Sequence, residues 1–469
     1  MYKKTKLPVV FFSKAIILLS ANQSFADASL TITPSQPVLQ TVTIGSYLNS
    51  DGGTAPLAYY DGGIEWKLSS SLPLPSDVLQ LSGKQYSFLN GVACYKMGHS
   101  CTAIGAYVTN AEGPDAPGYA PLSYFSTDSG AHWNLSATLP LPKDVSTPAN
   151  SIRTALFGVA CAGSGQSHCS TVGYYSNNTG ATVPLSYTSS NGGKKWKLSE
   201  TLPLPTDVII PTNKQNNILY GISCDPNGES CTAIGSYTNN NKSTVPLSYT
   251  STNRGRSWTL SQTPLPLPAD VPNSNQLSEL RAIFCNDMGF CTAVGYYYNN
   301  RTGVSPLSYV SSDSGATWQL SPALPLPPDV ISQIYRQKTY LNGVACSQTD
   351  SSCSAVGYYT NKNGVVAPLS YTSVDGGYLW TVSSSPLPLP SDAATGILSN
   401  SGLFSIICDA SKNLCNSVGY YKKAGTMGIV PLSYTSIDGG ITWEVNPNNL
   451  QLPADATQVN QLSRLNGVN

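Results

Sequence analysis

The sequence predicts an all-β fold in which one four-stranded antiparallel unit recurs along the chain. The seven tryptophans each close a copy of the segment S-x-D-x-G-x-x-W, and successive copies lie about 62 residues apart. Charged residues make up only 11% of the 469 residues, whereas Gly, Pro and Tyr, which are typical of short strands and turns, are abundant. No long apolar helical period occurs. Four-stranded units repeated in this number predict a seven-bladed β-propeller.

The strands of each unit are clearest in the copy that spans residues 340–392. It contains the runs LNGVAC, CSAVGYYTN, APLSYTSVDGG and LWTVSSS, each rich in strand-forming residues and bounded by Gly, Asn, Asp or Pro. The tail PLPLPSD follows. Because proline cannot donate to a sheet ladder, this tail is expected to end strand pairing and to protect the exposed edge.

The twelve cysteines fall into six local pairs, one pair per repeat. In an oxidising compartment they are expected to form disulfides across the turn between the first two strands. A zinc site is the disfavoured alternative, because no Cys-x-x-Cys spacing occurs and the chain has three histidines, His99, His132 and His168. No metal or other cofactor is expected. The expected pairs are Cys94/Cys101, Cys161/Cys169, Cys224/Cys231, Cys285/Cys291, Cys346/Cys353 and Cys408/Cys415.

The two ends of the chain are expected to share one blade. Residues 43–66 match the second, third and fourth strands of a repeat, but no first strand precedes them. The LNGV of residues 465–468 repeats that of residues 89–92 and could supply the missing strand. Thr41 stands at the second-strand cysteine position, and the chain ends before the partner position, so both halves of this disulfide are absent together. An open solenoid with capping repeats is the alternative.

The N-terminus reads as a secretory signal peptide, residues 1–26, with a basic start, an apolar run and Ser24-Phe25-Ala26 before the cleavage point. A membrane anchor is disfavoured, because the run is shorter than the roughly 18 apolar residues of a span and Lys14 interrupts it. Cleavage would leave residues 27–469 as a single propeller and would change the formal charge from 25 minus 25 to 21 minus 25, which is −4. This balance gives no electrostatic basis for binding nucleic acid. We expect a secreted or periplasmic monomer without a membrane span.

The S-x-D-x-G-x-x-W segment has a folding role for each of its fixed residues. The Asp is expected to accept hydrogen bonds from turn amides, the Gly to adopt positive φ, and the Trp to pack between sheets. The copies STDSGAHW, SSDSGATW, SVDGGYLW and SIDGGITW resemble the Asp-box (BNR) repeats of sialidases, sortilin-like receptors, some glycoside hydrolases and photosystem assembly propellers. The resemblance covers essentially all of the mature chain and implies structural boxes on the face away from the binding site. The box positions are Asp61, Asp128, Asn191, Asn253, Asp313, Asp375 and Asp438.

Function is therefore expected on the opposite face, where variable loops gather on a rigid scaffold. A sialidase needs three arginines, a Tyr–Glu pair and an Asp acid/base, but the Arg-Ile-Pro motif of that family is absent. Arginines near the starts of several first strands instead predict an anion- or sugar-binding cluster at the channel mouth. The alternative is that they are ordinary polar residues of a wet channel. The candidate binding residues are Arg153, Tyr220, Glu279, Arg281, Arg336, Tyr340 and Arg464, and no catalytic residue is assigned.

Two further periodic features are interpreted as structural. The Asp of each LPLPxD tail (Asp77, Asp144, Asp207, Asp270, Asp329, Asp392 and Asp455) is expected to cap its own turn. The Gly-Tyr-Tyr of the second strand is expected to pack within the sheet rather than to form a sugar platform. Its tyrosines are Tyr174, Tyr175, Tyr296, Tyr297, Tyr358, Tyr359, Tyr420 and Tyr421.

Together these features predict a non-catalytic binding propeller that recognises a glycan or a protein on its loop-bearing face. The alternative is a sialidase-like or other glycoside hydrolase that uses Glu279 or channel aspartates with the arginine cluster. Two carboxylates facing each other at about 5 to 10 Å would favour the hydrolase.

Overall fold

The computed structural model describes residues 41–60, 65–79, 85–95, 99–109, 118–146, 153–162, 168–210, 212–261, 264–272, 276–300, 303–331, 336–383, 386–396, 399–409, 413–426, 428–446, 450–457 and 460–469. They belong to one compact unit, Leu39–Asn469. The predicted signal peptide, residues 1–26, and Asp61 lie outside the described residues. Within the described ranges, no helix has the length and apolar character that crossing a membrane requires.

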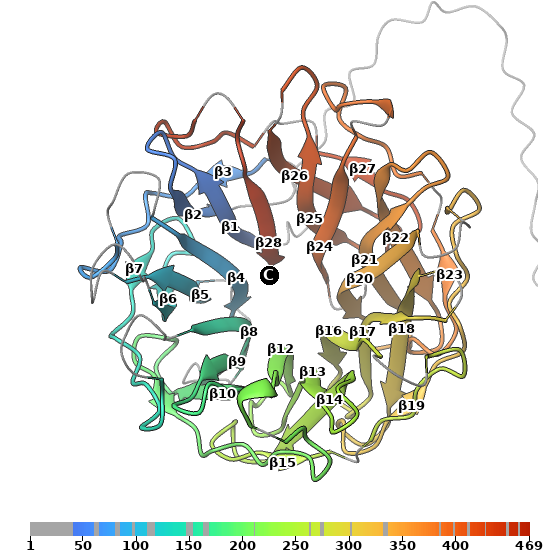
Figure 1. Ribbon diagram of the computed structural model, residues 1–469. Coiled ribbons are helices and arrows are strands. Elements are labelled where there is room, and N and C mark those ends of the chain that lie inside the picture. The colour runs from blue at the N-terminus through green and yellow to red at the C-terminus, as the bar shows by residue number, and fades with distance from the viewer. Residues whose placement is uncertain are drawn as a thin grey trace, which may run out of the picture. The chain divides into compact units, whose positions relative to one another are not determined.

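The described residues form antiparallel sheets whose first strands lie innermost, side by side around a common centre (Figure 1). These inner strands carry alternating apolar residues and are mostly buried. They are β4 (Ser87–Cys94), β8 (Thr154–Ala162), β12 (Ile218–Cys224), β16 (Ser278–Cys285), β20 (Gln337–Cys346), β24 (Ser401–Cys408) and β28 (Arg464–Val468).

The second and third strands are the most buried part of each sheet. The second strands are β1 (Val42–Leu48), β5 (Cys101–Val108), β9 (His168–Ser176), β13 (Cys231–Thr238), β17 (Cys291–Tyr298), β21 (Cys353–Thr360) and β25 (Cys415–Lys422). The third strands are β2 (Thr54–Tyr60), β6 (Tyr119–Ser126), β10 (Thr182–Ser189), β14 (Thr244–Ser251), β18 (Gly303–Ser311), β22 (Val366–Ser373) and β26 (Ile429–Ser436).

The outer strands have two residues each, because the proline-rich tail begins soon after the tryptophan and removes amide donors. They are β3 (Lys67–Leu68), β7 (Asn134–Leu135), β11 (Lys197–Leu198), β15 (Thr259–Leu260), β19 (Gln319–Leu320), β23 (Thr381–Val382) and β27 (Glu444–Val445). One 3-10 helix, Thr212–Lys214, is found in the described connections.

Six sheets are formed, five of four strands and one of eight. The eight-stranded sheet joins β16–β19 to β20–β23 through a short parallel pairing of Gly303 and Val304 with Gln337 and Lys338. Each inner strand contacts the next one along the chain, and β28 contacts both β24 and β4. This arrangement of four-stranded antiparallel units is that of a β-propeller.

The first and last parts of the described chain pair in one sheet, in the order β28-β1-β2-β3. β28 runs antiparallel to β1, with Thr43 opposite Val468. The backbone amides of Val42 and Asn469 each donate to the carbonyl of the other, at 2.6 and 2.9 Å. The predicted exchange of a strand between the two ends is thus present as hydrogen bonds.

The six predicted disulfides are all present and lie within their own sheets. Five of them join the last residue of an inner strand to the first residue of the second strand. The turn that they span lies against the box turn of a sheet, as when the amide of Ser314 donates to the carbonyl of Gly289. Disulfide turns and box turns therefore share one edge of the sheets, called the turn edge below.

The disulfide between Cys161 and Cys169 differs from the predicted position across the turn. β8 continues past Cys161 to Ala162, and β9 already begins at His168, so that Ala162 pairs with His168 beyond the bond. Cys169 is therefore the second residue of its strand, whereas the repeat pattern places it first. Its Sγ is buried and lies 3.7 Å from Thr102 Oγ1 of the neighbouring sheet. The predicted pairing of Cys169 is confirmed, but the bond lies inside the ladder, because this hairpin is one residue pair longer than the others.

The box turn spanning residues 436–443 shows how the motif folds. Ser436 Oγ donates to Asp438 Oδ1 at 2.8 Å, and the same carboxylate oxygen accepts the amide of Thr442 at 2.9 Å. Gly440 has φ +88°, a conformation that glycine adopts without a Cβ penalty. Trp443 Nε1 donates to Ser370 Oγ of the neighbouring sheet at 3.0 Å. The motif therefore folds its own turn and links it to the next sheet.

Candidate functional site

Every inner strand carries a β-bulge, and the bulges determine which side chains line the centre of the molecule. Each strand carries a leucine that is 0% exposed, and the pairing register shifts immediately after it. The extra residue is left unpaired and projects beside the residue that precedes the leucine. On β16 the leucine is Leu280 and the extra residue is Arg281. The opposing glycine is required here, because a Cβ on Gly295 would lie 1.9 Å from the carbonyl oxygen of Glu279.

On three inner strands the extra residue is an asparagine with a structural role. Asn90 Nδ2 donates to the carbonyl of Leu156 at 2.9 Å, and Asn342 Nδ2 donates to that of Leu403 at 2.9 Å. Asn466 Nδ2 makes the same bond to Leu89, at 2.7 Å, from the C-terminal strand to β4. Each asparagine therefore ties its inner strand to the next one.

On the other four inner strands the extra residue is aromatic or cationic. These residues are Phe157, Tyr220, Arg281 and Phe404, and they line one cavity of about 530 Å³ together with Tyr296, Tyr340, Tyr358 and Arg464. We call this space the central cavity. Its wall combines the asparagine links of β28, β4 and β20 with the aromatic and cationic groups of the other inner strands.

Arg281 is the most engaged of these side chains. Its Nη2 lies 2.5 Å from Glu279 Oε2 and donates to Tyr296 OH at 3.0 Å. Tyr296 OH in turn donates to Glu279 Oε2 at 2.8 Å. The guanidinium also lies over the ring of Tyr220, 4.1 Å from its centroid. Arg281 is thus charge-compensated and held in position by three neighbours.

Aromatic rings extend from Arg281 in both directions. Tyr340 contacts Tyr296 edge-on, with ring centroids 4.7 Å apart, and contacts Tyr358 at 4.8 Å. On the other side, Tyr220 lies 5.3 Å from Phe157. This row of rings, with Arg281 between Tyr220 and Tyr296, is called the aromatic arc and lines the central cavity. Aromatic side chains that line a cavity bind apolar faces of ligands.

Arg464 is placed differently. Its guanidinium lies 5.8 Å from the ring centroid of Phe404, which in turn stacks on Tyr420 at 5.5 Å. Among the described residues, no carboxylate forms an ion pair with it, whereas Arg281 is paired with Glu279. Arg464 is therefore the lining residue whose positive charge is available to an anionic ligand.

The protonation states of these groups follow from burial. Burial raises the pKa of Tyr220 to about 12, with a further contribution from Glu279, and burial likewise raises the pKa of Tyr340 to about 12. Both hydroxyls are therefore neutral donors near pH 7. Burial lowers the pKa of Arg281, but the charge of Glu279 and the two adjacent tyrosines outweigh it and raise that pKa overall. Burial lowers the pKa of Arg464, with partial opposition from Tyr420.

The candidate residues separate into two groups. Tyr220, Arg281, Tyr340 and Arg464 line the central cavity, and Glu279 lies directly behind Arg281. Arg153 and Arg336 are exposed and are not among the residues that line it. Arg153 pairs with Tyr119 through an isolated bridge instead.

Four aromatic lining residues were missed by the reasoning from sequence, namely Phe157, Tyr296, Tyr358 and Phe404. A comparison of the repeats at the residue that follows the recurring leucine would have found Phe157 and Phe404, because asparagine recurs there in other repeats. Tyr296 belongs to a Gly-Tyr-Tyr run in which the two tyrosines have different surroundings.

The second tyrosine of each Gly-Tyr-Tyr is the hydrogen-bond partner of the aspartate in the LPLPxD tail. Tyr297 OH donates to Asp270 Oδ1 at 3.0 Å, and Tyr359 OH donates to Asp329 Oδ1 at 2.8 Å. The expected cap of its own turn is thus replaced, for this carboxylate, by a bond to a tyrosine of the adjacent strand. The same bond links Tyr47 to Asp455, Tyr107 to Asp77, Tyr175 to Asp144, Tyr237 to Asp207 and Tyr421 to Asp392.

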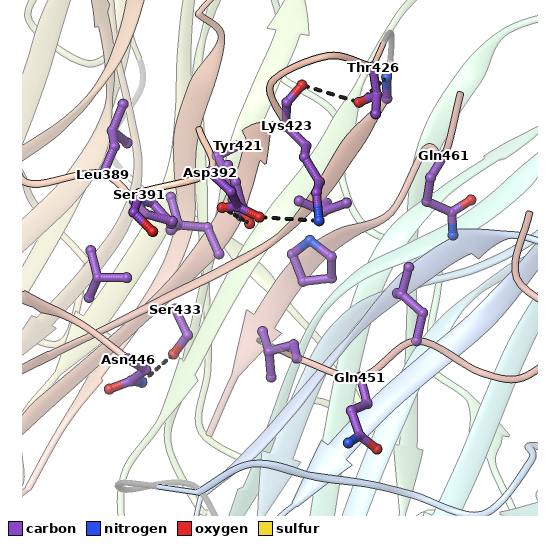
Figure 2. Close-up of a pocket in the computed structure, with 18 of the residues that line it drawn as sticks. Leu389, Ser391, Asp392, Tyr421, Lys423, Thr426, Ser433, Asn446, Gln451 and Gln461 are labelled. Atoms are coloured by element: carbon purple, nitrogen blue, oxygen red, sulfur yellow. Dashed lines mark hydrogen bonds and ion pairs between the residues drawn. The ribbon is translucent and has the colours of Figure 1, made fainter. Parts of the chain in front are cut away.

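A larger cavity of about 890 Å³ lies between the tails 389–392 and 450–457 and strands β25 and β26 (Figure 2). Its charged groups bind one another, because Lys423 Nζ lies 3.2 Å from Asp392 Oδ2. Asn446 Nδ2 similarly donates to Ser433 Oγ at 2.8 Å, as Figure 2 shows. The charged groups of this cavity thus neutralise each other, whereas Arg464 of the central cavity has no ion-pair partner among the described residues, so the central cavity is the stronger candidate.

Comparisons with known proteins inform the fold only. No protein-family profile matches the chain, and no curated protein sequence matches it. Among solved structures, an ulvan lyase of polysaccharide lyase family PL25 is similar, with a TM-score of 0.50 and 9% identity over 87% of this chain and 92% of that one.

Two further solved structures are similar at lower TM-scores. The GH74 enzyme of Niastella koreensis has a TM-score of 0.44 and 14% identity over 87% of this chain and 65% of that one. YCF48 from Cyanidioschyzon merolae has a TM-score of 0.40 and 13% identity over 82% and 89%. These scores support no functional inference. The strand topology and the central cavity identify the chain as a β-propeller.

Proposed function

We propose that this protein is an exported, non-catalytic carbohydrate-binding propeller with an Asp-box architecture of seven blades. Six blades would be continuous, and the pairing of β28 with β1 would complete the seventh. The six disulfides support an oxidising compartment, either the periplasm or the cell exterior. Removal of residues 1–26 would leave residues 27–469 as one monomeric domain. N-terminal sequencing of the exported protein and sedimentation analysis test the cleavage and the monomeric state.

The aromatic arc is the observation that carries the binding function. Sugar rings have apolar faces that stack on aromatic side chains, and their hydroxyls bond to the neutral phenols and amides that border such surfaces. Tyr340 of the arc and Phe404 of the neighbouring inner strand β24 offer rings to the central cavity, and Arg464 adds a cation. A glycan that carries an acidic group matches this combination best.

A glycan array of the mature protein tests the proposal. We expect binding to acidic oligosaccharides, and we expect Phe404→Ala and Tyr340→Ala to weaken it by about tenfold or more, as for buried aromatic contacts. Tyr359→Phe is the matched control, because Tyr359 packs away from the cavity against Asp329. If no glycan binds while the protein remains folded, the carbohydrate proposal is wrong and a protein becomes the expected ligand.

A glycoside hydrolase is the second candidate, and the buried Glu279 beside Tyr296 is the observation that favours it. Hydrolysis requires a second carboxylate across the bond to be cleaved. The same oligosaccharide panel, assayed for release of reducing ends, distinguishes the two candidates. Turnover that disappears in Glu279→Gln would establish the enzyme and overturn the non-catalytic proposal.

A further inference from the structure

Another cavity lies at the turn edge, beside the central cavity along β16, where Ile283 lines the central cavity and Phe284 lines this one. It has a volume of about 930 Å³ and is bounded by the disulfide turns of β16–β19 and β20–β23 and by the box turn of residues 373–380. The two disulfide turns are linked, because the amide of Asp287 donates to Gln348 Oε1 at 3.2 Å. We call this cavity the edge pocket.

The edge pocket gathers aromatic residues that interrupt the repeat pattern. Phe284 precedes the first cysteine of its pair, where the other repeats have Ala, Ser or Ile. Phe290 precedes the second cysteine, where the other repeats have Ser, His or Leu. Tyr378 follows the box glycines, where no other repeat has an aromatic residue. Two departures in the β16–β17 disulfide hairpin and one in the box turn of residues 373–380 thus meet in one place, which folding of the repeat alone does not require.

The edge pocket includes large apolar residues that are accessible to solvent. Phe290 is 52% exposed and Met288 is 66% exposed, although both are large hydrophobic residues. Just outside the lining residues, Val374 and Leu379 of the same box turn are 87% and 57% exposed. Exposed apolar residues grouped in this way mark a binding surface. With them, the apolar surface is larger than a single small chemical group would cover.

The charges of the edge pocket have one sign. Asp350 and Asp375 are among its lining residues, and Asp287 lies between the lining residues Asn286 and Met288. The lining residues include no Lys, Arg or His. Aromatic faces and carboxylates both attract cations, and the attraction to aromatic faces is strongest for cations that have lost part of their hydration. The complementary ligand is therefore cationic and apolar at once.

We propose that the edge pocket binds a lysine or arginine side chain of an extended peptide segment in a protein partner. The cation would lie among Phe290, Tyr378 and Asp350, and the apolar neighbours of the segment would cover Met288 and Leu379. This site is independent of the proposed glycan site, because the two cavities have no lining residue in common.

The probe is a fluorescent peptide in which lysine alternates with leucine, compared by anisotropy with its glutamate counterpart. We expect the lysine peptide to bind and the glutamate peptide not to bind. Tyr378→Ser and Phe290→Ser should each weaken binding about tenfold, the size of a cation–π contribution of 1 to 2 kcal/mol. Asp350→Asn should weaken binding and reduce its dependence on salt.

Two controls separate this site from its surroundings. Ile437→Ser removes an exposed apolar side chain outside the pocket and should leave peptide binding unchanged. Phe404→Ala alters the central cavity and should also leave peptide binding unchanged, so a failure of the glycan proposal does not affect this test. Equal binding of both peptides, or unchanged binding in the Tyr378 and Phe290 variants, would overturn the proposal.

A second copy of this chain is the competing occupant, because Lys194 and Lys195 are cations of another box turn on the turn edge. Sedimentation at increasing protein concentration distinguishes it. Self-association that disappears both in Tyr378→Ser and in the double variant Lys194→Glu with Lys195→Glu would assign the pocket to a second copy and overturn the proposal of a separate partner. A monomer at all concentrations, together with binding of the lysine peptide, supports it.

Discussion

Trp133 packs in the same core cluster as Ala58, and its buried indole nitrogen has no hydrogen-bond partner among the described residues. The corresponding tryptophans donate to a serine hydroxyl in the neighbouring sheet, as Trp196 does to Ser123 at 2.9 Å. In the sheet next to Trp133, alanine occupies that serine position, in PLAY instead of PLSY. This one junction between sheets therefore lacks a bond that the others have.

Ala58→Ser should stabilise the protein. The added hydroxyl would accept the hydrogen bond of Trp133 Nε1, and a buried donor that gains a partner contributes about 1 kcal/mol to the free energy of unfolding. Urea unfolding followed by tryptophan fluorescence measures the change. Ser123→Ala is the reciprocal control and should destabilise by about 1 to 3 kcal/mol, because it leaves Trp196 without its acceptor. A destabilised Ala58→Ser protein would show that the site has no room for the hydroxyl.

Asn466→Ala should cost about 1 kcal/mol of unfolding free energy, because it removes the bond from β28 to the carbonyl of Leu89. Asn342→Ala removes the same bond between two inner strands of the continuous chain and is the matched control. A larger loss for Asn466→Ala than for Asn342→Ala would show that the junction between the two ends limits stability.

Deletion of residues 462–469 should lower the melting temperature sharply, because it removes β28 and leaves one edge of β1 without its strand partner. Differential scanning calorimetry measures the effect. An unchanged melting temperature would contradict a closed ring of blades.

Acid should weaken three box turns together. Burial raises the pKa of Asp438, but hydrogen bonds from Thr442 and Ser436 outweigh it, and the pKa lies below its ordinary value. Hydrogen bonds likewise hold the pKa of Asp128 and Asp313 below the ordinary value. A carboxyl group with a lowered folded-state pKa stabilises the fold above its unfolded pKa of about 4, and this contribution is lost as the pH falls toward the folded value.

The triple variant Asp128→Asn, Asp313→Asn and Asp438→Asn should therefore show a smaller loss of stability between about pH 5 and pH 2 than the wild type. Asparagine fits this position, because Asn191 and Asn253 accept the same amide bonds in two natural boxes, each at 3.0 Å. Urea unfolding across this pH range provides the measurement. Identical pH profiles would assign the acid sensitivity to other carboxylates.

Glu279→Gln should strengthen the binding of acidic glycans, because it removes the negative charge that compensates Arg281 in the central cavity. Glu200→Gln, a change to an exposed glutamate, is the matched control and should have no effect on binding. Isothermal titration with an acidic oligosaccharide measures both variants. Weaker binding by Glu279→Gln would mean that Glu279 positions Arg281, or the ligand itself, rather than opposing the anion.

The fold follows from sequence because each repeat records the same local rules. Tryptophan spacing, cysteine pairs and proline tails mark the limits of the strands, and the sheets follow those limits. At Cys169 the repeat pattern does not give the exact start of the strand. The pairing of Cys169 with Cys161 is confirmed, but the strand begins one residue earlier, at His168, because backbone pairing and not the cysteine decides where the ladder ends.

The contact between Arg281, Glu279 and Tyr296 was harder to predict from the sequence than the fold. Strand alternation alone places Glu279 and Arg281 on one side of β16, but Arg281 is also the unpaired residue of a bulge. That bulge depends on Gly295 of the opposing strand, which leaves room for the carbonyl of Glu279. A contact that depends on the partner strand in this way is not recorded in the local pattern of either strand.

The residue types alone likewise do not predict that the two tyrosines of Gly-Tyr-Tyr have different surroundings. Tyr296 faces the central cavity and Tyr297 bonds to Asp270, although the two are chemically identical and adjacent. Alternation of side chains across a strand separates them, but only the position of each sheet relative to the centre decides which one meets a ligand. The edge pocket was missed for a similar reason, since Tyr378 comes from a box turn that is separated in the chain from the β16–β17 hairpin, which carries Phe284 and Phe290.

The placement of the disulfides has a consequence for how such a chain changes length. Every cross-link closes within a single sheet, over a sequence separation of 6 to 8 residues, and none joins one sheet to another. A gene duplication or deletion of one whole repeat therefore adds or removes both cysteines of a pair and leaves no unpaired thiol. The oxidative folding of the remaining repeats is unaffected, so the number of repeats can vary independently of the disulfide chemistry.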